Sequence, residues 1–190
     1  DGSAIWDESP YPDQELQIAD ATFEWLATAA KADRIEDVNR FLDVFVSEAR
    51  LAFLWSRLLG VGAETPRILG PCLWELAIAK PMIEEPDTLY SLGAFLERAF
   101  QFLGESQRRT IEQTILNLGK TNDPERKERM EHRRDRLIAR IPPNLLLTGE
   151  GKELRESLAK EDKLLPNAPL FSVSTASWSP ITEEEILRPQ

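Results

Sequence analysis

Residues 51–63 read LAFLWSRLLGVGA, and this stretch decides what kind of fold the chain can form. Apolar residues upstream of it recur every three or four positions, which predicts one helix that begins at Asp33 and ends at Gly60 or Gly62. The later turns are apolar on nearly all sides, a pattern typical of a helix buried at the centre of a protein. Arg57 interrupts the run, and no segment approaches the ~18 uncharged apolar residues of a membrane span.

Six further amphipathic helices are predicted from apolar residues at the same spacing. The clearest start is at Asp123 and Pro124, because a carboxylate caps free backbone N–H groups and proline suits the first helical position. Pro66 and Pro86 mark two more starts, and Pro81 is expected to block a helix that precedes it. The predicted ranges are 14–31, 66–79, 86–103, 105–118, 124–141 and 148–162. The apolar stripe of the first helix comprises Ile18, Ala21, Thr22, Trp25, Leu26 and Ala29.

The whole pattern predicts an all-α fold of about seven helices in antiparallel pairs. Leu, Ala, Glu and Arg are plentiful, β-branched residues are sparse, and no segment is a convincing strand. The helical domain is expected to span residues 13–163. Residues 1–12 are polar and carry prolines, and residues 164–190 are rich in Pro, Ser and Thr, so both are predicted to be extended.

Three predicted helices end in similar tripeptides, LLG at 58–60, FLG at 102–104 and NLG at 117–119. This layout of short, paired helices resembles a HEAT-like α-solenoid, whose units contain roughly 40 residues. It is similar to the helical-repeat segments that large multidomain bacterial proteins use for sensing or assembly. The resemblance implies a scaffold that binds other proteins and transfers no catalytic residue. A closed, irregular helical bundle is the alternative.

Catalysis finds little support in the residue types. Cys72 is the only cysteine and His132 the only histidine, and sixty residues separate the two. LGKT at 118–121 lacks the glycine that a phosphate-binding loop needs five positions before Gly119, so this glycine is expected to end a helix. Glu128 and His132 are four residues apart, but a second histidine or a cysteine cluster is missing. We therefore predict no enzyme activity, no cofactor and no metal.

Composition limits the environment of the protein. The formal net charge is −10, which disfavours broad binding to nucleic acid phosphates. A single cysteine cannot form an internal disulfide and suits a reducing compartment, and no signal peptide is visible, so we predict a cytoplasmic protein. The chain begins with Asp1 and not with methionine, from which we expect a fragment of a larger intracellular protein.

The stretch ERKERMEHRRDR, residues 125–136, is basic within this acidic chain. One interpretation is a solvated helix whose cations contact the acidic body of the protein. The other is a docking patch for a phosphate group, a nucleic acid or an acidic partner. The candidate binding residues of that patch are Arg126, Lys127, Arg129, Arg133 and Arg134. Trp178 in the C-terminal segment is a candidate anchor for a partner, unless it packs on the helices of its own chain.

Together these observations predict a non-enzymatic protein–protein interaction or scaffold module. Its partner would be another protein or another domain of the same parent protein, with no membrane involved. Two alternatives stay open. One is a nucleic-acid-associated accessory domain that uses the basic helix 124–141, and the other is an acidic inhibitor of a basic partner.

Overall fold

The computed structural model describes residues 14–120 and 122–164, so the predicted extended segment 1–12 and the predicted tail beyond Leu164 lie outside the described residues. The described chain contains nine α-helices, three short 3-10 helices and no strand, which confirms the all-α fold. The α-helices are α1 (Gln14–Lys31), α2 (Ile35–Glu48), α3 (Ala52–Glu64), α4 (Pro66–Leu73), α5 (Lys80–Glu84), α6 (Pro86–Ala99), α7 (Glu105–Leu116), α8 (Pro124–Arg140) and α9 (Gly149–Lys160). The 3-10 helices are η2 (Trp74–Ala77), η3 (Phe100–Phe102) and η4 (Pro143–Leu145).

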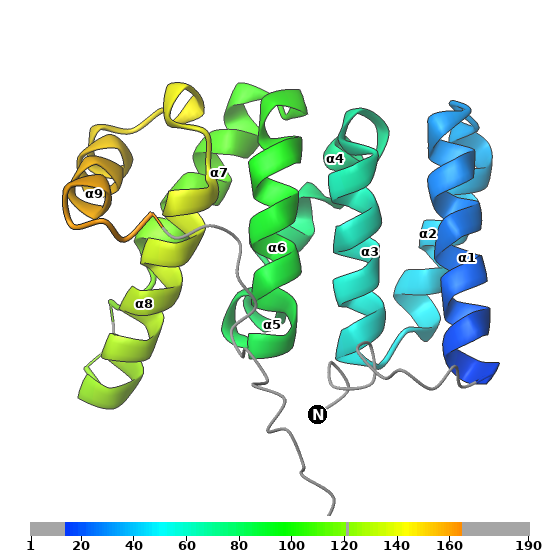
Figure 1. Ribbon diagram of the computed structural model, residues 1–190, viewed down its shortest axis with the longest axis horizontal. Coiled ribbons are helices and arrows are strands. Elements are labelled where there is room, and N and C mark those ends of the chain that lie inside the picture. The colour runs from blue at the N-terminus through cyan, green and yellow to red at the C-terminus, as the bar shows by residue number, and fades with distance from the viewer. Residues whose placement is uncertain (1–13, 121, 165–190) are drawn as a thin grey trace, which may run out of the picture.

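Four helices stand side by side in a row and run in the same direction: α1, α3, α6 and α8 (Figure 1). They begin at residues 14, 52, 86 and 124, so successive starts are 38, 34 and 38 residues apart. The chain returns between them through α2, α4 with η2, and α7, and α9 follows α8. This near-regular spacing is compatible with a helical repeat, in which each pair of helices packs mainly on its neighbours.

The core lies where α3 packs along α6, the most extensive helix contact in the described chain. Leu58 and Leu59 of α3 are fully buried, as is Phe95 of α6. Gly62 permits this close approach, because a Cβ at that position would lie 3.0 Å from the side chains of Leu73 and Phe95. The prediction that 51–63 forms a central buried helix is therefore confirmed.

The single helix predicted from Asp33 to Gly60 is wrong, because the chain breaks between α2 and α3. Ala49 has an extended backbone, with ψ of 123°. The guanidinium of Arg50 donates hydrogen bonds to the carbonyl oxygens of Ser47, at 2.6 Å, and Ala49, at 3.2 Å. These carbonyls at the end of α2 therefore have partners without a further helical turn.

Gly60 and Gly62 lie inside α3 and do not end it, contrary to the prediction. The helix ends instead at Glu64 and is capped by Thr65, whose hydroxyl donates to the carbonyl of Val61 at 2.8 Å. The helix predicted at 66–79 stops earlier, and η2 continues it. No helix continues through Pro81 from the preceding side, as predicted, and Pro81 occupies the first turn of a new short helix, α5, where no N–H donor is needed.

None of the helices in the described ranges is long and apolar enough to cross a membrane.

Candidate functional site

The basic helix α8 begins as the sequence predicts. The carboxylate of Asp123 accepts hydrogen bonds from the backbone N–H groups of Glu125, at 3.1 Å, and Arg126, at 3.3 Å, and Pro124 is the first helical residue. Its apolar residues form a thin buried stripe that consists of Met130, Leu137, Ile138 and Ile141. The charged side chains of α8 therefore surround a narrow line of contact with the body of the protein.

Two of the five predicted cations reach Glu84 at the end of α5. Arg126 forms an ion pair with the Glu84 carboxylate, with Nη2 and Oε1 2.9 Å apart. Arg133 donates a hydrogen bond to the backbone carbonyl of the same residue. Burial lowers the pKa of Arg133, while the nearby carboxylates of Glu85 and Glu84 raise it. These contacts correspond to the first interpretation of the stretch, in which its cations contact the acidic body.

The other three candidate cations are not joined to this contact. Arg134 pairs with the adjacent Asp135 at 2.8 Å, and Lys127 lies 4.0 Å from Glu131 one turn along. Arg129 is exposed and forms no hydrogen bond or ion pair with a described residue. The structure thus divides the predicted patch into three parts with different surroundings. Trp178 lies outside the described residues, so its role as an anchor stays a prediction.

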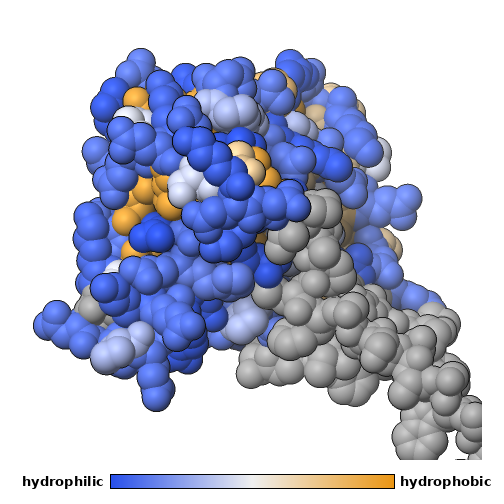
Figure 2. All heavy atoms as spheres, turned by 60° about the vertical axis from the view of Figure 1, so that its left-hand side comes forward, coloured by the Kyte–Doolittle hydropathy of each residue, from blue (hydrophilic) through white to orange (hydrophobic). Residues whose placement is uncertain are grey.

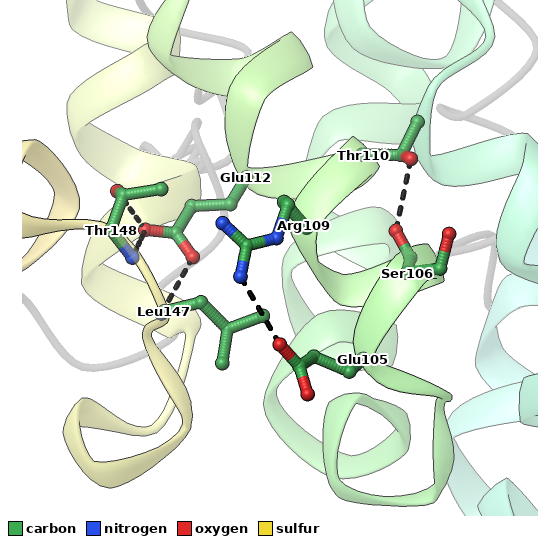
Figure 3. Close-up of polar contacts among 7 residues, drawn as sticks. All are labelled: Glu105, Ser106, Arg109, Thr110, Glu112, Leu147 and Thr148. Atoms are coloured by element: carbon green, nitrogen blue, oxygen red, sulfur yellow. Dashed lines mark hydrogen bonds and ion pairs between the residues drawn. The ribbon is translucent and has the colours of Figure 1, made fainter.

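A buried carboxylate joins α7 to the start of α9 (Figure 3). Glu112 of α7 is fully buried, and it accepts hydrogen bonds from the backbone N–H groups of Leu147, at 2.8 Å, and Thr148, at 2.9 Å. The Thr148 hydroxyl also donates to Glu112, and it caps α9 by accepting from the N–H of Gly151 at 3.0 Å. We call Glu112, Leu147, Thr148 and Gly151 the polar lock.

Sequence reasoning missed the polar lock, although a signal was present. Glu112 follows Ile111 directly and precedes Ile115 by three residues, so the helix face that carries these isoleucines also carries one acidic residue. A carboxylate on a buried face needs several hydrogen-bond donors. By contrast, Glu105 and Arg109 pair at 3.1 Å on the exposed side of the same helix (Figure 3).

The α8–α9 end of the row is polar on its outer face. Figure 2 shows this side of the molecule forward, and most of its surface is hydrophilic, with apolar areas scattered among the polar residues. Among the described residues beyond 103, none is an exposed large apolar side chain. Six of the eight such side chains in the described chain belong instead to residues 18–51.

Exposed apolar side chains lie on both helices of the α1–α2 pair. Trp25 and Phe41 are neighbours across the pair, with ring centroids 6.1 Å apart. Ile18 lies two turns before Trp25 on α1, and Val44 lies one turn after Phe41 on α2. Ile18, Val44 and Trp25 are 69%, 58% and 43% exposed. We call these four residues the end stripe.

Polar groups border both ends of the end stripe. The guanidinium of Arg34 lies 5.5 Å from the ring centre of Trp25 and pairs with Asp37 at 3.2 Å. Glu48 is exposed at the other end, on the same face of α2 as Phe41 and Val44, seven and four residues away. Asp37 is paired with Arg34, while Glu48 accepts a hydrogen bond from the hydroxyl of Ser47 at 3.2 Å. The guanidinium of Arg50 donates to the carbonyl of Ser47 at 2.6 Å, so a cation lies at this end as well.

The end stripe corrects the apolar stripe predicted for α1. Of its six residues, Ile18, Ala21, Thr22 and Trp25 are exposed, whereas Leu26 and Ala29 are buried as predicted. The residues that α1 buries are Ala19, Phe23, Leu26, Ala27, Ala29 and Ala30. Small alanines let α1 pack closely on the body of the protein, and the larger residues on the neighbouring face remain outside. Spacing alone did not distinguish these two overlapping faces.

Other chemical candidates stay dispersed in the described chain. Residues 14–120 and 122–164 contain no group of three or more His, Cys, Asp or Glu arranged to hold a metal ion. Cys72 is exposed on α4, and His132 is exposed on α8. Gly119 follows α7 with φ of +86°, which confirms that it ends a helix.

No family model matches this chain, and comparisons with curated proteins and with solved structures find no match.

Proposed function

We propose that this chain is a non-enzymatic protein interaction module, a HEAT-like helical repeat that binds a protein partner at its α1–α2 end. The observation that carries the proposal is the end stripe. In a helical repeat the terminal pair has a neighbour on one side only, and a polar outer face keeps an isolated end soluble. The first pair of the described row, α1–α2, has Ile18, Trp25 and Val44 exposed. Exposed apolar patches of this kind mark interaction sites.

The opposite end supports this choice by contrast. The α8–α9 face is mainly hydrophilic (Figure 2), and the polar lock holds the start of α9 against α7. Partner binding through apolar contacts therefore has a better surface at α1–α2 than at α9. The proposal retains the expectation of a module within a larger, cytoplasmic bacterial protein, where the partner is another protein or a neighbouring domain.

The two alternatives make different demands on charge. Binding of nucleic acid needs several cations that face outward, but Arg126 and Arg133 are turned toward Glu84. Inhibition of a basic partner needs an acidic face, and the net charge of −10 supplies acidic residues without concentrating them on one helix. Neither alternative uses the end stripe, so variants of the stripe distinguish them from the proposal.

The test is recovery of a partner from a native lysate with the tagged full chain, at two salt concentrations and with nuclease treatment. The stripe variant combines Ile18→Ser with Val44→Ser, and Arg129→Ser serves as the control on the basic helix. We expect a protein partner that survives nuclease and is lost with the stripe variant only. A further chain without residues 165–190 tests the predicted contribution of Trp178.

Recovery that disappears with nuclease or moderate salt, and that depends on Arg129, would contradict the proposal and favour nucleic acid. Recovery of a protein that neither the stripe variant nor the control reduces would also contradict it, because the partner would then use another surface.

A further inference from the structure

We infer that α9 is a strap that opens as one unit while the rest of the helix row stays folded. This property of the α8–α9 end is independent of the proposed function. Two features carry it. The helix buries few apolar side chains, and the contacts that fasten it are polar ones that water can replace when the helix leaves.

α9 buries fewer apolar side chains than any other helix of eight or more residues in the described chain. Eight of its twelve residues are exposed, and Leu158 is its only buried apolar side chain. From α9 only the half-buried Leu154 packs against the main apolar cluster of the described residues. By comparison, α8 buries Met130, Leu137 and Ile138. Elements with little apolar burial open at the lowest cost in free energy.

Polar contacts fasten α9 at two places. At its start lies the polar lock, whose carboxylate belongs to Glu112 of α7. In its middle, the guanidinium of Arg155 donates to the carbonyl oxygens of Ile141, at 3.0 Å, and Ala139, at 3.4 Å, at the end of α8. Opening returns the Glu112 carboxylate and the Arg155 guanidinium to water. Their hydration offsets much of the cost of breaking these bonds.

The chain between α8 and α9 limits the moving part to α9 itself. Ile141 and Leu146 are buried in the main apolar cluster, so the hinge lies after Leu146. Gly149 follows, and a Cβ at that position would meet nothing within 4 Å, so no neighbour fixes its backbone. Gly151 lies in the same first turn, and glycine has wide backbone freedom and a low helix propensity. The start of α9 is therefore suited to act as a hinge.

The experiment is native-state hydrogen exchange of the full chain, measured amide by amide with NMR. The reporters in the strap are the amides of residues 153–160, which donate to carbonyls within α9. The references are the slowest amides of α3 and α6, which exchange when the core unfolds. We expect the α9 amides to exchange at least about 100-fold faster than these references.

A core variant separates opening of the strap from unfolding of the whole protein. Leu92→Val shortens a fully buried side chain of α6. It is expected to speed exchange in α3 and α6 about tenfold, since it makes the core unfold more readily. The α9 amides should change less than about twofold, because the core stays folded when the strap opens.

Two charge-matched variants of α7 test the fastening. Glu112→Gln keeps the size of the side chain but removes the charge that three donors share, and it is expected to speed exchange of the α9 amides about tenfold. Glu105→Gln makes the same change on the exposed side of the helix and should alter their exchange less than about twofold.

Exchange of the α9 amides as slow as that of the α3 and α6 references would overturn the inference. An equal effect of Leu92→Val on all three helices would overturn it too, because α9 would then open only when the whole protein unfolds. Equal effects of Glu112→Gln and Glu105→Gln on the α9 amides would show that the polar lock does not fasten the strap.

Discussion

The two ends of the helix row finish in different ways. At the α8–α9 end, the segment before α9 turns its backbone donors toward Glu112, and the outer surface is polar. At the α1–α2 end, packing is completed by small alanines on the inner face of α1, and large apolar residues remain outside. The comparison indicates that one end of a helical repeat can be completed by pairing its buried polar groups within the chain. An end with exposed apolar residues still has surface that a partner can bury.

The largest expected effect breaks the polar lock. Glu112→Ala removes the acceptor of two backbone N–H groups and one hydroxyl in a buried position. We expect it to lower the free energy of unfolding by about 3 kcal/mol, because each unsatisfied donor costs about 1–3 kcal/mol and part of the loss is recovered by water. Urea unfolding monitored by circular dichroism measures this change.

The matched control is Glu105→Ala on the same helix. Glu105 pairs with Arg109 on the surface, where such a pair contributes at most about 1 kcal/mol. Similar losses for the two variants would show that the buried carboxylate does not hold the α9 end.

A second way to disturb the lock uses two glycines of α9. A Cβ added at Gly151 would lie 2.3 Å from the Glu112 carboxylate, whereas a Cβ at Gly149 meets nothing within 4 Å. We expect Gly151→Ala to lower the free energy of unfolding by about 2 kcal/mol, since the crowded carboxylate must move away from its donors. Gly149→Ala should raise it by about 0.5 kcal/mol through helix propensity. Thermal unfolding of both variants gives the sign of each change in the free energy of unfolding. Changes of the same sign would contradict the close contact of Gly151 with the Glu112 carboxylate.

The sequence predicted the helices well because their start signals are local. Asp123 and Pro124 specify the start of α8 through bonds within four residues, and the structure has the same cap. The end of α3 was predicted wrongly because Gly62 is needed for packing and not for ending the helix. It makes room for Phe95 of α6, which is distant in sequence. The break after α2 was missed because it depends on where the Arg50 side chain points, which spacing does not reveal.

The next effect concerns the basic helix. Arg133→Ala removes the hydrogen bond to the Glu84 carbonyl and is expected to lower the free energy of unfolding by about 1 kcal/mol. Arg129→Ala, on the same helix one turn earlier, should change it by less than about 0.5 kcal/mol, because Arg129 has no described partner. Chemical unfolding of the two variants compares them directly. An equal loss of unfolding free energy would mean that Arg129, although exposed, also stabilises the α8–α9 end.

The candidate site could be predicted only in part. A basic patch was predicted from five cations that are close in sequence, but which of them turn toward Glu84 depends on the position of α5, more than 40 residues away. The end stripe was hidden for another reason. Ile18 and Trp25 have the spacing of a core stripe, and only the packing of α1 on the body decides which of its two apolar faces is buried.

The smallest expected effect on stability concerns the end stripe itself. Val44 is 58% exposed, so Val44→Ser should change the free energy of unfolding by less than about 0.5 kcal/mol. Val38 lies on the same helix and is fully buried, and Val38→Ser should cost about 2–4 kcal/mol, because it leaves a cavity and a buried hydroxyl. The two variants make the same chemical change, so their difference in urea unfolding measures how open the α1–α2 end is. A cost for Val44→Ser close to that for Val38→Ser would mean that another part of the chain covers the stripe in the folded protein. The two ends would then both be closed, and the case for a partner at α1–α2 would be lost.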